Sequence, residues 1–500
     1  MIVQTASGKV SGVPLQGAYV FRGIPYAAPP TGKRRFQPPA PAQPWPGIRK
    51  CDHFGPLAPQ QTDPSGGATR VHSEDCLYLN VWTRGCEKES MPVLVYIHGG
   101  GFVSGTGADC DGLRHAAEDG IVYVSINYRL GALGFLYLGE VLGEAYAASG
   151  NNGLLDIAAA LQWVQRNISA FGGDPARVTV IGNSAGAKCT ASLYAMEVAR
   201  GFFHRAVAQS GATQAIRDRR TANVTTLRIL EELGLSGADP SLLLELPFEQ
   251  LIAAQSAVGS DTSRSLHMFG PVADGRVIPL DPLAGIAASS GLPPLLIGTN
   301  ENEASIFIRD NSMLHSPGME PLNRFFGSHA PAVWDAYQHY AEAMSPTDAW
   351  CTTLTEHLYT IGALQFAQAL ASSGTPVWMY RLRAGGHLGA THGYEGSLIH
   401  WDPEAQAPEA QAPEAQAPAA LAAGDPYAVP AEQYPLARSM REAWVAFIRS
   451  GDPNIDALPA WPVYGTKPAI MVLDTASRVA DDLPEPAGIG VPHQVWRVDR

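Results

Sequence analysis

Ser184 lies at the centre of the string Gly-Asn-Ser-Ala-Gly at residues 182–186. The residues before it, 178–181, are mostly apolar and β-branched as in a buried strand, whereas the residues from Ala185 onward favour a helix. A serine on such a sharp strand-to-helix turn exposes its hydroxyl, and the flanking glycines leave room around it. The N–H of Ala185 would begin the helix, where unpaired amides and the helix dipole favour negative charge. The pattern therefore predicts a nucleophilic serine with an oxyanion donor beside it.

A second glycine-rich segment, His-Gly-Gly-Gly-Phe at residues 98–102, follows a predicted buried strand at 92–97. Successive glycines after a strand allow several backbone N–H groups to point into one small space. We expect Gly100 and Gly101 to complete an oxyanion hole with Ala185, each donor being typically worth about 3 kcal/mol to a transition state. The alternative, a flexible turn, is disfavoured by the serine motif downstream.

A serine hydroxyl needs a base to take its proton, and an imidazole base needs an acid to fix its tautomer. Two carboxylates, Glu301 and Glu303, follow a predicted strand at 294–298. His392 follows another predicted strand in a loop with nearby glycines, and His387 is an alternative five residues earlier. The order serine, acid, histidine along the chain is the one found where such an elbow occurs.

Strand-like and helix-like segments alternate between about residues 90 and 210, with strands expected at 93–97, 121–127, 178–181 and 206–209 and a helix at 154–167. This alternation predicts an α/β fold whose mostly parallel central sheet is covered by helices on both faces. We expect residues 1–500 to form a single catalytic domain. The unit Glu-Ala-Gln-Ala-Pro repeats three times within 403–418, which predicts a disordered surface insertion or, alternatively, a segment at the pocket mouth.

The composition excludes several classes of protein. Apolar residues make up 46% of the 500 residues, the mean hydropathy is −0.04, and no apolar run is long enough to span a bilayer. A net charge of −13 argues against nucleic-acid partners and anionic membrane surfaces. The six cysteines lack C-x-x-C spacing, so we expect reduced thiols and no metal, and the proposed chemistry needs no cofactor. The first residues are strand-like rather than a signal peptide, which favours a cytoplasmic protein.

The chain resembles the type-B carboxylesterase family, the α/β-hydrolases that include cholinesterases and bacterial p-nitrobenzyl esterases. The resemblance extends nearly from end to end and rests on motifs that occur in the family's order. Besides the two glycine motifs, these are Phe-Arg-Gly-Ile-Pro-Tyr-Ala at 21–27, Glu-Asp-Cys-Leu-Tyr-Leu-Asn-Val at 74–81, Gln-Ser-Gly at 209–211, Pro-Val-Ala-Asp-Gly at 271–275 and Gly-Asp-Pro-Asn at 451–454.

The resemblance implies roles for individual residues. The family's Asp-Glu-Gly triplet reads Asn-Glu-Ala at 302–304, which makes Glu303 the acid and leaves Glu301 as the fallback. His392 matches the histidine of the Gly-x-x-His-Gly-x-Glu string, and Ser210 matches a serine that hydrogen-bonds near the acid. Asn183 replaces the glutamate found before the serine in most members, which removes a negative charge beside the nucleophile.

Two further departures concern substrate and compartment. Cholinesterase-type members carry a tryptophan before the Glu-Asp-Cys string, but none lies between Trp45 and Trp82, so a choline-ester specialist is disfavoured. Ala58 stands where secreted members have the disulfide partner of Cys76.

We therefore expect a serine carboxylesterase that hydrolyses short- to medium-chain esters through an acyl-enzyme. A lipase-like esterase acting on longer chains and a non-catalytic interaction module of the same fold are the alternatives. The expected partner is a small-molecule ester, and neither its identity nor the oligomeric state follows from the sequence. Candidate residues of the substrate pocket are Phe102, Asn183, Leu266, Met268, Phe269 and Ile306.

Overall fold

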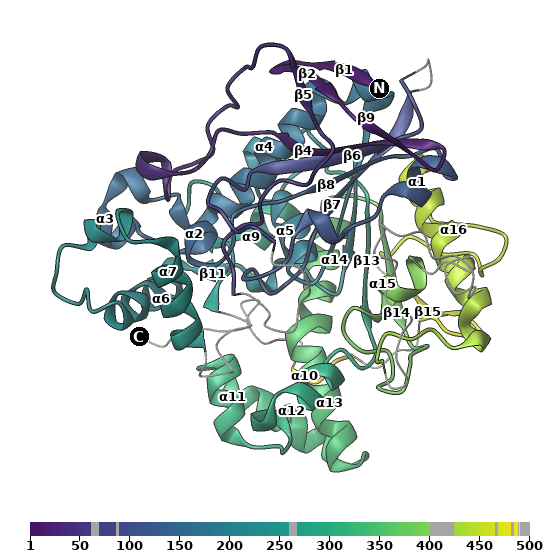
Figure 1. The fold of residues 1–500 in the computed structure, drawn as a ribbon. Helices are drawn as coiled ribbons and strands as arrows, with labels where there is room; N and C mark the ends of the chain where they lie inside the picture. The colour runs from purple at the N-terminus through teal and green to yellow at the C-terminus, as the bar shows by residue number, and fades with distance from the viewer. Residues whose placement is uncertain are drawn as a thin grey trace.

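A computed structural model describes residues 1–61, 70–86, 90–259, 268–400, 425–465, 469–481, 485–488 and 490 (Figure 1). The repeat at 403–418 lies outside the described residues. In the described part of the chain, no helix is both long enough and apolar enough to cross a membrane.

An eleven-stranded sheet runs through the middle of the protein in the order β16-β15-β14-β13-β10-β9-β7-β8-β6-β4-β3 (Figure 1). Its strands are β3 (Val13–Leu15), β4 (Ala18–Pro25), β6 (Tyr78–Thr83), β7 (Met91–Ile97), β8 (Val122–Ile126), β9 (Gly173–Asn183), β10 (Arg205–Gln209), β13 (Leu295–Asn300), β14 (Val377–Leu382), β15 (Ile470–Leu473) and β16 (Arg478–Ala480). Two small sheets accompany it, made of β1 (Ile2–Thr5), β2 (Gly8–Ser11) and β5 (Ile48–Lys50), and of β11 (Arg217–Asp218) and β12 (Val272–Ala273).

The centre of the large sheet is parallel and its edges are antiparallel. Strands β8, β7, β9, β10, β13, β14 and β15 pair in parallel, whereas β3, β4 and β6 at one edge and β16 at the other pair antiparallel. The predicted mostly parallel sheet is confirmed, and the predicted strands at 93–97, 121–127, 178–181 and 206–209 lie within or largely within β7, β8, β9 and β10.

Side chains of the central strands alternate between two hydrophobic cores, as the pleat of a strand requires. In β7, Val93 and Val95 belong to one core and Leu94 to the other, and in β14 Val377 and Trp378 divide in the same way. The first core includes residues of the helices α4, α5 and α14, and the second includes residues of α1, α15 and α16. Helices therefore cover both faces, which explains why these strands are apolar on both sides.

The α-helices of the described residues are α1 (Leu113–Ala117), α2 (Gly131–Phe135), α3 (Gly139–Leu142), α4 (Asn152–Asn167), α5 (Ala185–Leu193), α6 (Arg219–Glu232), α7 (Phe248–Gly259), α9 (Pro282–Ala287), α10 (Ser305–Asp310), α11 (Met319–Phe326), α12 (Ala330–Ala341), α13 (Pro346–Thr355), α14 (Ile361–Ser372), α15 (Tyr394–Ile399) and α16 (Tyr434–Ser450). Helix α4 matches the predicted helix at 154–167 closely.

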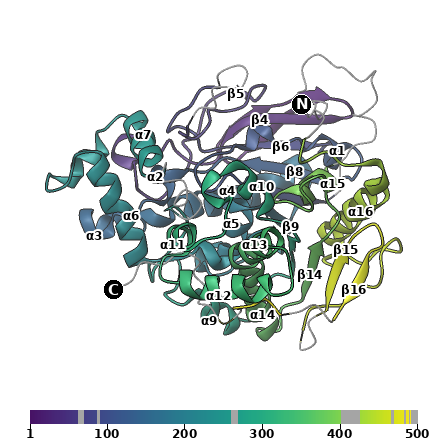
Figure 2. The ribbon, with the colours of Figure 1, turned by 90° about the horizontal axis from the view of Figure 1, so that it is seen from below.

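Helices α11, α12 and α13 follow β13 and precede β14 in the chain, and together they form a separate layer. This layer lies at the bottom of Figure 1 and in the middle of Figure 2. Their own hydrophobic cluster includes Leu322, Phe325, Val333 and Trp350, together with Tyr359 from the segment that joins α13 to α14. This layer contributes to the site because Tyr359 contacts the loop that follows β14.

Candidate active site

The predicted catalytic segments all follow parallel strands of the central sheet. The glycine loop follows β7, Ser184 follows β9, Glu303 follows β13 and His392 lies in the loop after β14. Because the carboxyl ends of parallel strands meet at one edge, the topology brings segments separated by almost 300 residues into one region.

Ser184 occupies a strained backbone conformation at the junction of β9 and α5, with φ of 57° and ψ of −121°. Such a positive φ is uncommon for a residue with a side chain and costs about 1–3 kcal/mol. The turn is held by the Ser184 N–H, which donates to the Gln209 carbonyl at 2.9 Å. Side chains on Gly182 or Gly186 would collide with the backbone of Gly186 or with the Ile97 carbonyl, respectively. The predicted elbow therefore has the geometry that its glycines suggest.

His392 and Glu303 form a hydrogen bond of 2.6 Å between Nδ1 and Oε2. The Glu303 side chain is fully buried, and its other oxygen accepts the Asn300 N–H at 2.8 Å. A carboxylate bound at Nδ1 keeps the proton there, so that Nε2 is left as the basic nitrogen. Nε2 is buried and, within the described residues, has no hydrogen-bond partner, so the bond from the Ser184 hydroxyl is not formed here. Such bonds are often long in the absence of substrate.

The alternative acid and base do not take part in this pair. Glu301 instead accepts hydrogen bonds from the exposed Arg383 guanidinium at 3.1 and 3.2 Å. The imidazole that contacts Glu303 belongs to His392 and not to His387.

Two aromatic rings pack against the His392 imidazole, and neither belongs to the predicted catalytic residues. The Phe307 ring centroid lies 5.2 Å away and the Tyr359 ring centroid 4.7 Å away. Tyr359 belongs to a π-helical turn, Glu356–Thr360, inserted between α13 and α14. Such turns change the direction of side chains within a continuous helix and are frequent at functional sites. Tyr359 was not identified from the sequence, because no pattern in a single sequence predicts a π-helical turn.

The predicted oxyanion donors lie in two places, the glycine loop after β7 and the first residue of α5. Gly100 and Gly101 have φ of 101° and 61°, which turns the chain sharply after β7, and the N–H groups of Val103 and Ser104 both donate to the Gly100 carbonyl at 3.0 Å. Among the described residues, no acceptor is hydrogen-bonded to the N–H groups of Gly100, Gly101 or Ala185. These three amides therefore keep their hydrogen-bonding capacity for a ligand.

A second carboxylate, Glu395, is buried behind the serine turn and accepts three side-chain donors. Its Oε1 accepts from Ser210 Oγ at 2.7 Å and from Asn183 Nδ2 at 2.9 Å, and its Oε2 accepts from Asn300 Nδ2. Burial, with a contribution from the Glu303 charge, raises the pKa of Glu395, whereas the hydrogen bonds from Ser210 and Asn300 lower it. Ser210 thus bonds to Glu395 and not to Glu303. The sequence signal for Glu395 was its position three residues after His392, but sequence reasoning gave it no role.

Lys188 lies one helical turn after Ser184 in α5, and its N–H donates to the Ser184 carbonyl at 3.0 Å. The residue is only 5% exposed, and burial lowers the pKa of Lys188 to about 8, although the Glu303 carboxylate acts in the opposite direction. From the sequence, Lys188 was predicted only to be part of a helix. The residue types that favour a helix do not show whether a charged side chain is buried.

The described residues among the candidates for the substrate pocket are largely buried. Phe102 and Phe269 are fully buried, Met268 and Ile306 are 4% and 7% exposed, and the Asn183 side chain faces Glu395. Leu266 lies outside the described residues. Their role as the pocket lining stays a prediction.

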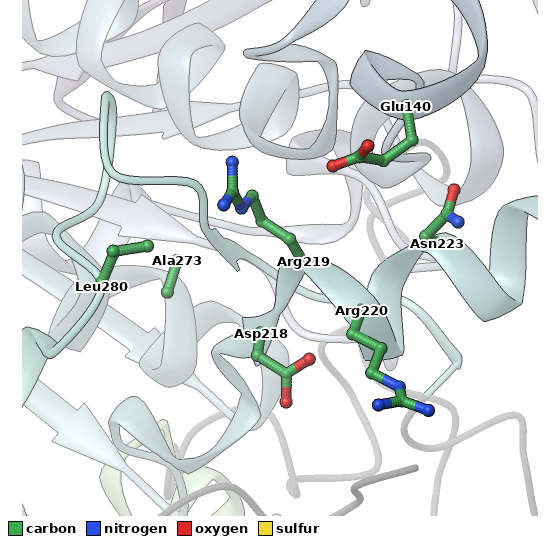
Figure 3. Close-up of a pocket in the computed structure, with 7 residues that line it drawn as sticks. All are labelled: Glu140, Asp218, Arg219, Arg220, Asn223, Ala273 and Leu280. Atoms are coloured by element: carbon green, nitrogen blue, oxygen red, sulfur yellow. The ribbon is translucent and has the colours of Figure 1, made fainter. Parts of the chain in front are cut away.

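A surface cavity of about 510 Å³ at the start of α6 is separate from these residues (Figure 3). Its lining consists of Glu140, Asp218, Arg219, Arg220, Asn223, Ala273 and Leu280. Because none of the predicted catalytic residues lines it, its size does not indicate where the chemistry takes place. In the described part of the chain, no group of three or more His, Cys, Asp or Glu side chains could hold a metal ion, and all six cysteines are free.

The central sheet, the strained serine turn and the buried histidine–carboxylate pair define an α/β-hydrolase. The sequence model of the carboxylesterase family matches residues 1–486, and the chain belongs to that family. It is therefore a carboxylic ester hydrolase of the carboxylesterase type.

Relatives of known name agree with this assignment. The chain is 34% identical to the para-nitrobenzyl esterase of Bacillus subtilis, with 96% of each chain covered, and 33% identical to the phenmedipham hydrolase of Pseudarthrobacter oxydans, with 98% of each covered. A crystal structure of a Geobacillus stearothermophilus carboxylesterase is similar to it with a TM-score of 0.83 at 37% identity, covering 96% of this chain and 98% of that one.

Proposed function

We propose that this protein is a serine carboxylesterase that hydrolyses short- to medium-chain esters through an acyl-enzyme on Ser184. The observation that carries the proposal is the 2.6 Å hydrogen bond between His392 and the buried Glu303. A buried carboxylate at Nδ1 both orients the imidazole and stabilises the imidazolium that forms when Nε2 accepts a proton. The strained Ser184 turn and the three unpaired amides support the same chemistry.

In the proposed mechanism, Ser184 Oγ attacks the ester carbonyl carbon while its proton passes to His392 Nε2. The carbonyl oxygen becomes an oxyanion and is stabilised by the N–H groups of Gly100, Gly101 and Ala185. His392 then protonates the departing alcohol, which leaves the acyl group on Ser184. A water molecule, deprotonated by His392, releases the carboxylic acid and restores the serine.

The proposal is tested by hydrolysis of p-nitrophenyl esters from acetate to palmitate. An aromatic alcohol is a suitable first choice because one relative is named para-nitrobenzyl esterase. We expect the highest kcat/KM with short to medium acyl chains and a loss of about 10³-fold or more in Ser184→Ala. Activity unchanged in Ser184→Ala would refute the serine mechanism, and a preference for emulsified long-chain esters would indicate a lipase-like enzyme instead.

We also propose that the protein acts in the cytoplasm. All six cysteines are free thiols, which is compatible with a reducing compartment. Fractionation of the native cells with activity staining tests this proposal, and activity outside the cytoplasmic fraction would contradict it.

A further inference from the structure

Lys188 is 5% exposed, and its ammonium lies against the Tyr359 ring beside the proposed catalytic base. Lys188 Nζ lies 5.2 Å from the centroid of the Tyr359 ring, and that ring lies 4.7 Å from the His392 imidazole. Within the described residues, the ammonium has neither a hydrogen-bond acceptor nor an ion-pair partner, and the residue is 5% exposed. A buried charge in this condition is costly, and proteins mostly keep such charges where a function needs them.

Glu303, the carboxylate whose charge acts on Lys188, is already engaged by other groups, and so is the second buried carboxylate of the site. Glu303 accepts hydrogen bonds from His392 and from the Asn300 N–H. Glu395 accepts from Asn183, Ser210 and Asn300. The Glu303 charge attracts the ammonium through space, but among the described residues no carboxylate oxygen forms an ion pair with it. Apart from the Tyr359 ring, the described residues therefore leave the ammonium donors available to a bound molecule.

The start of the Lys188 side chain is held near the serine turn. Helix α5 is buried along its whole length, and the Lys188 Cγ is 3.0 Å from where a Cβ at residue 211 would stand, next to the Ser184 carbonyl at 2.5 Å. The aliphatic stem is thus confined next to the serine turn, and its charged end is confined next to Tyr359.

We propose that Lys188 determines specificity by binding a negatively charged group of the substrate, so that esters carrying a carboxylate, such as half-esters of dicarboxylic acids, are preferred. This inference rests on the proposed esterase function and names the substrate class of the same site. Asn183 acts in the same direction, because a neutral amide rather than a carboxylate stands beside the nucleophile and does not repel such a substrate.

The test compares charged and neutral esters of matched size. One pair places the charge on the acyl side, p-nitrophenyl hemiglutarate against p-nitrophenyl pentanoate, and the other places it on the alcohol side, 4-acetoxybenzoate against phenyl acetate. The readout is the ratio of kcat/KM for the charged ester to kcat/KM for the neutral ester. We expect this ratio to fall by about 10- to 100-fold in Lys188→Met for at least one pair, as is typical for loss of a charged hydrogen bond.

The ratio separates binding of the substrate charge from a general effect on the catalytic residues. If Lys188 only supports Glu303 and His392 electrostatically, Lys188→Met changes both esters of a pair equally, and an unchanged ratio in both pairs overturns the proposal. Lys188→Gln provides a second neutral variant in case the first is poorly folded. Failure of the proposed function is distinguishable, because wild-type protein would then hydrolyse neither ester of a pair.

A pH series of the wild-type ratio gives an independent readout. The groups that face or adjoin Lys188 are Glu303, Tyr359 and Cys189, with His392 beyond the Tyr359 ring. Effects of pH on the chemical step that the two esters share cancel in the ratio. We expect the ratio to decline between pH 7 and 9 in the wild type and to stay constant in Lys188→Met; a constant wild-type ratio would contradict the proposal.

Discussion

Replacement of Lys188 by methionine should make the folded protein more stable at neutral pH. Methionine has a similar length and shape without the charge, so the variant removes the cost of burying an ammonium group but keeps the packing. Burial lowers the pKa of Lys188 from the ordinary value of 10.5 to about 8. The charged form is therefore disfavoured in the folded protein relative to the unfolded chain.

The size of the effect follows from this difference in pKa. Each pKa unit corresponds to about 1.4 kcal/mol, so at pH 7, below both pKa values, the buried charge costs about 3 kcal/mol of folding stability. Between about pH 8 and 10.5 the unfolded chain binds more protons at this lysine than the folded protein does. The stability of the wild type therefore gains from this lysine as the pH rises through that window, and by pH 10 the cost falls to about 1 kcal/mol.

The assay is urea unfolding of the wild type and Lys188→Met, followed by tryptophan fluorescence at pH 7 and at pH 10. We expect the variant to exceed the wild type by up to about 3 kcal/mol in unfolding free energy at pH 7 and by about 1 kcal/mol at pH 10. Lys33→Met, at an exposed lysine, should change stability by less than about 0.5 kcal/mol at both pH values. A variant that is less stable at pH 7, or a difference that does not shrink with pH, would refute the reasoning.

Three further substitutions test the site. Glu303→Gln should lower kcat by about 10³- to 10⁴-fold because the imidazole loses the carboxylate at Nδ1. The control Glu301→Gln affects only the exposed pair with Arg383 and should leave kcat within about 2-fold. Equal losses of kcat in the two variants would contradict the assignment. Gly100→Ala should lower kcat by about 10²-fold because its new methyl group would collide with Ser104. In Gly101→Ala the methyl group meets only Val103 at 3.9 Å, so the loss of kcat should be smaller. The reverse order of the two losses would argue against this loop geometry. Tyr359→Ala should lower kcat/KM by about 10-fold because the imidazole loses the ring that packs against it. Tyr359→Phe keeps the ring, so its kcat/KM should fall by less than about 2-fold. An equal fall in both variants would assign the effect to the hydroxyl group.

The central fold was predictable from sequence because its strands are short, apolar on both sides and separated by helical segments. β7, β14 and the buried end of β9 belong to this class; the predicted catalytic segments directly follow β7 and β9, and His392 lies ten residues after β14 ends. The antiparallel edge was not predictable in the same way. Strands β3, β4 and β6 pair with partners chosen by packing and turn geometry, and no local pattern in the sequence specifies that order.

The candidate site was predictable where a backbone requirement fixes the residue type. The glycines around Ser184 and after His98 are required by close approach and positive φ, so they stand out in the sequence. Glu395 and Tyr359 were not predicted as functional residues, because their importance depends on burial and on contacts across more than 30 residues. No local sequence pattern marks a carboxylate as buried or a ring as lying beside an imidazole, because both follow only from the folded structure.

Asn183 and Lys188 set the charge around the serine turn. A glutamate at position 183 would place a second carboxylate within hydrogen-bond distance of Glu395, since the Asn183 amide lies 2.9 Å from it. Two such carboxylates cannot both be ionised at low cost. Asparagine avoids this conflict by donating to Glu395, and Lys188, four residues after Ser184 in α5, adds a positive charge. Both residues make the surroundings of the serine less negative, and the ammonium does so at a cost in stability. Lys188 therefore accounts both for a lower stability and for the proposed preference for anionic esters, so measurements of stability and of specificity on one variant, Lys188→Met, bear on a single physical cause.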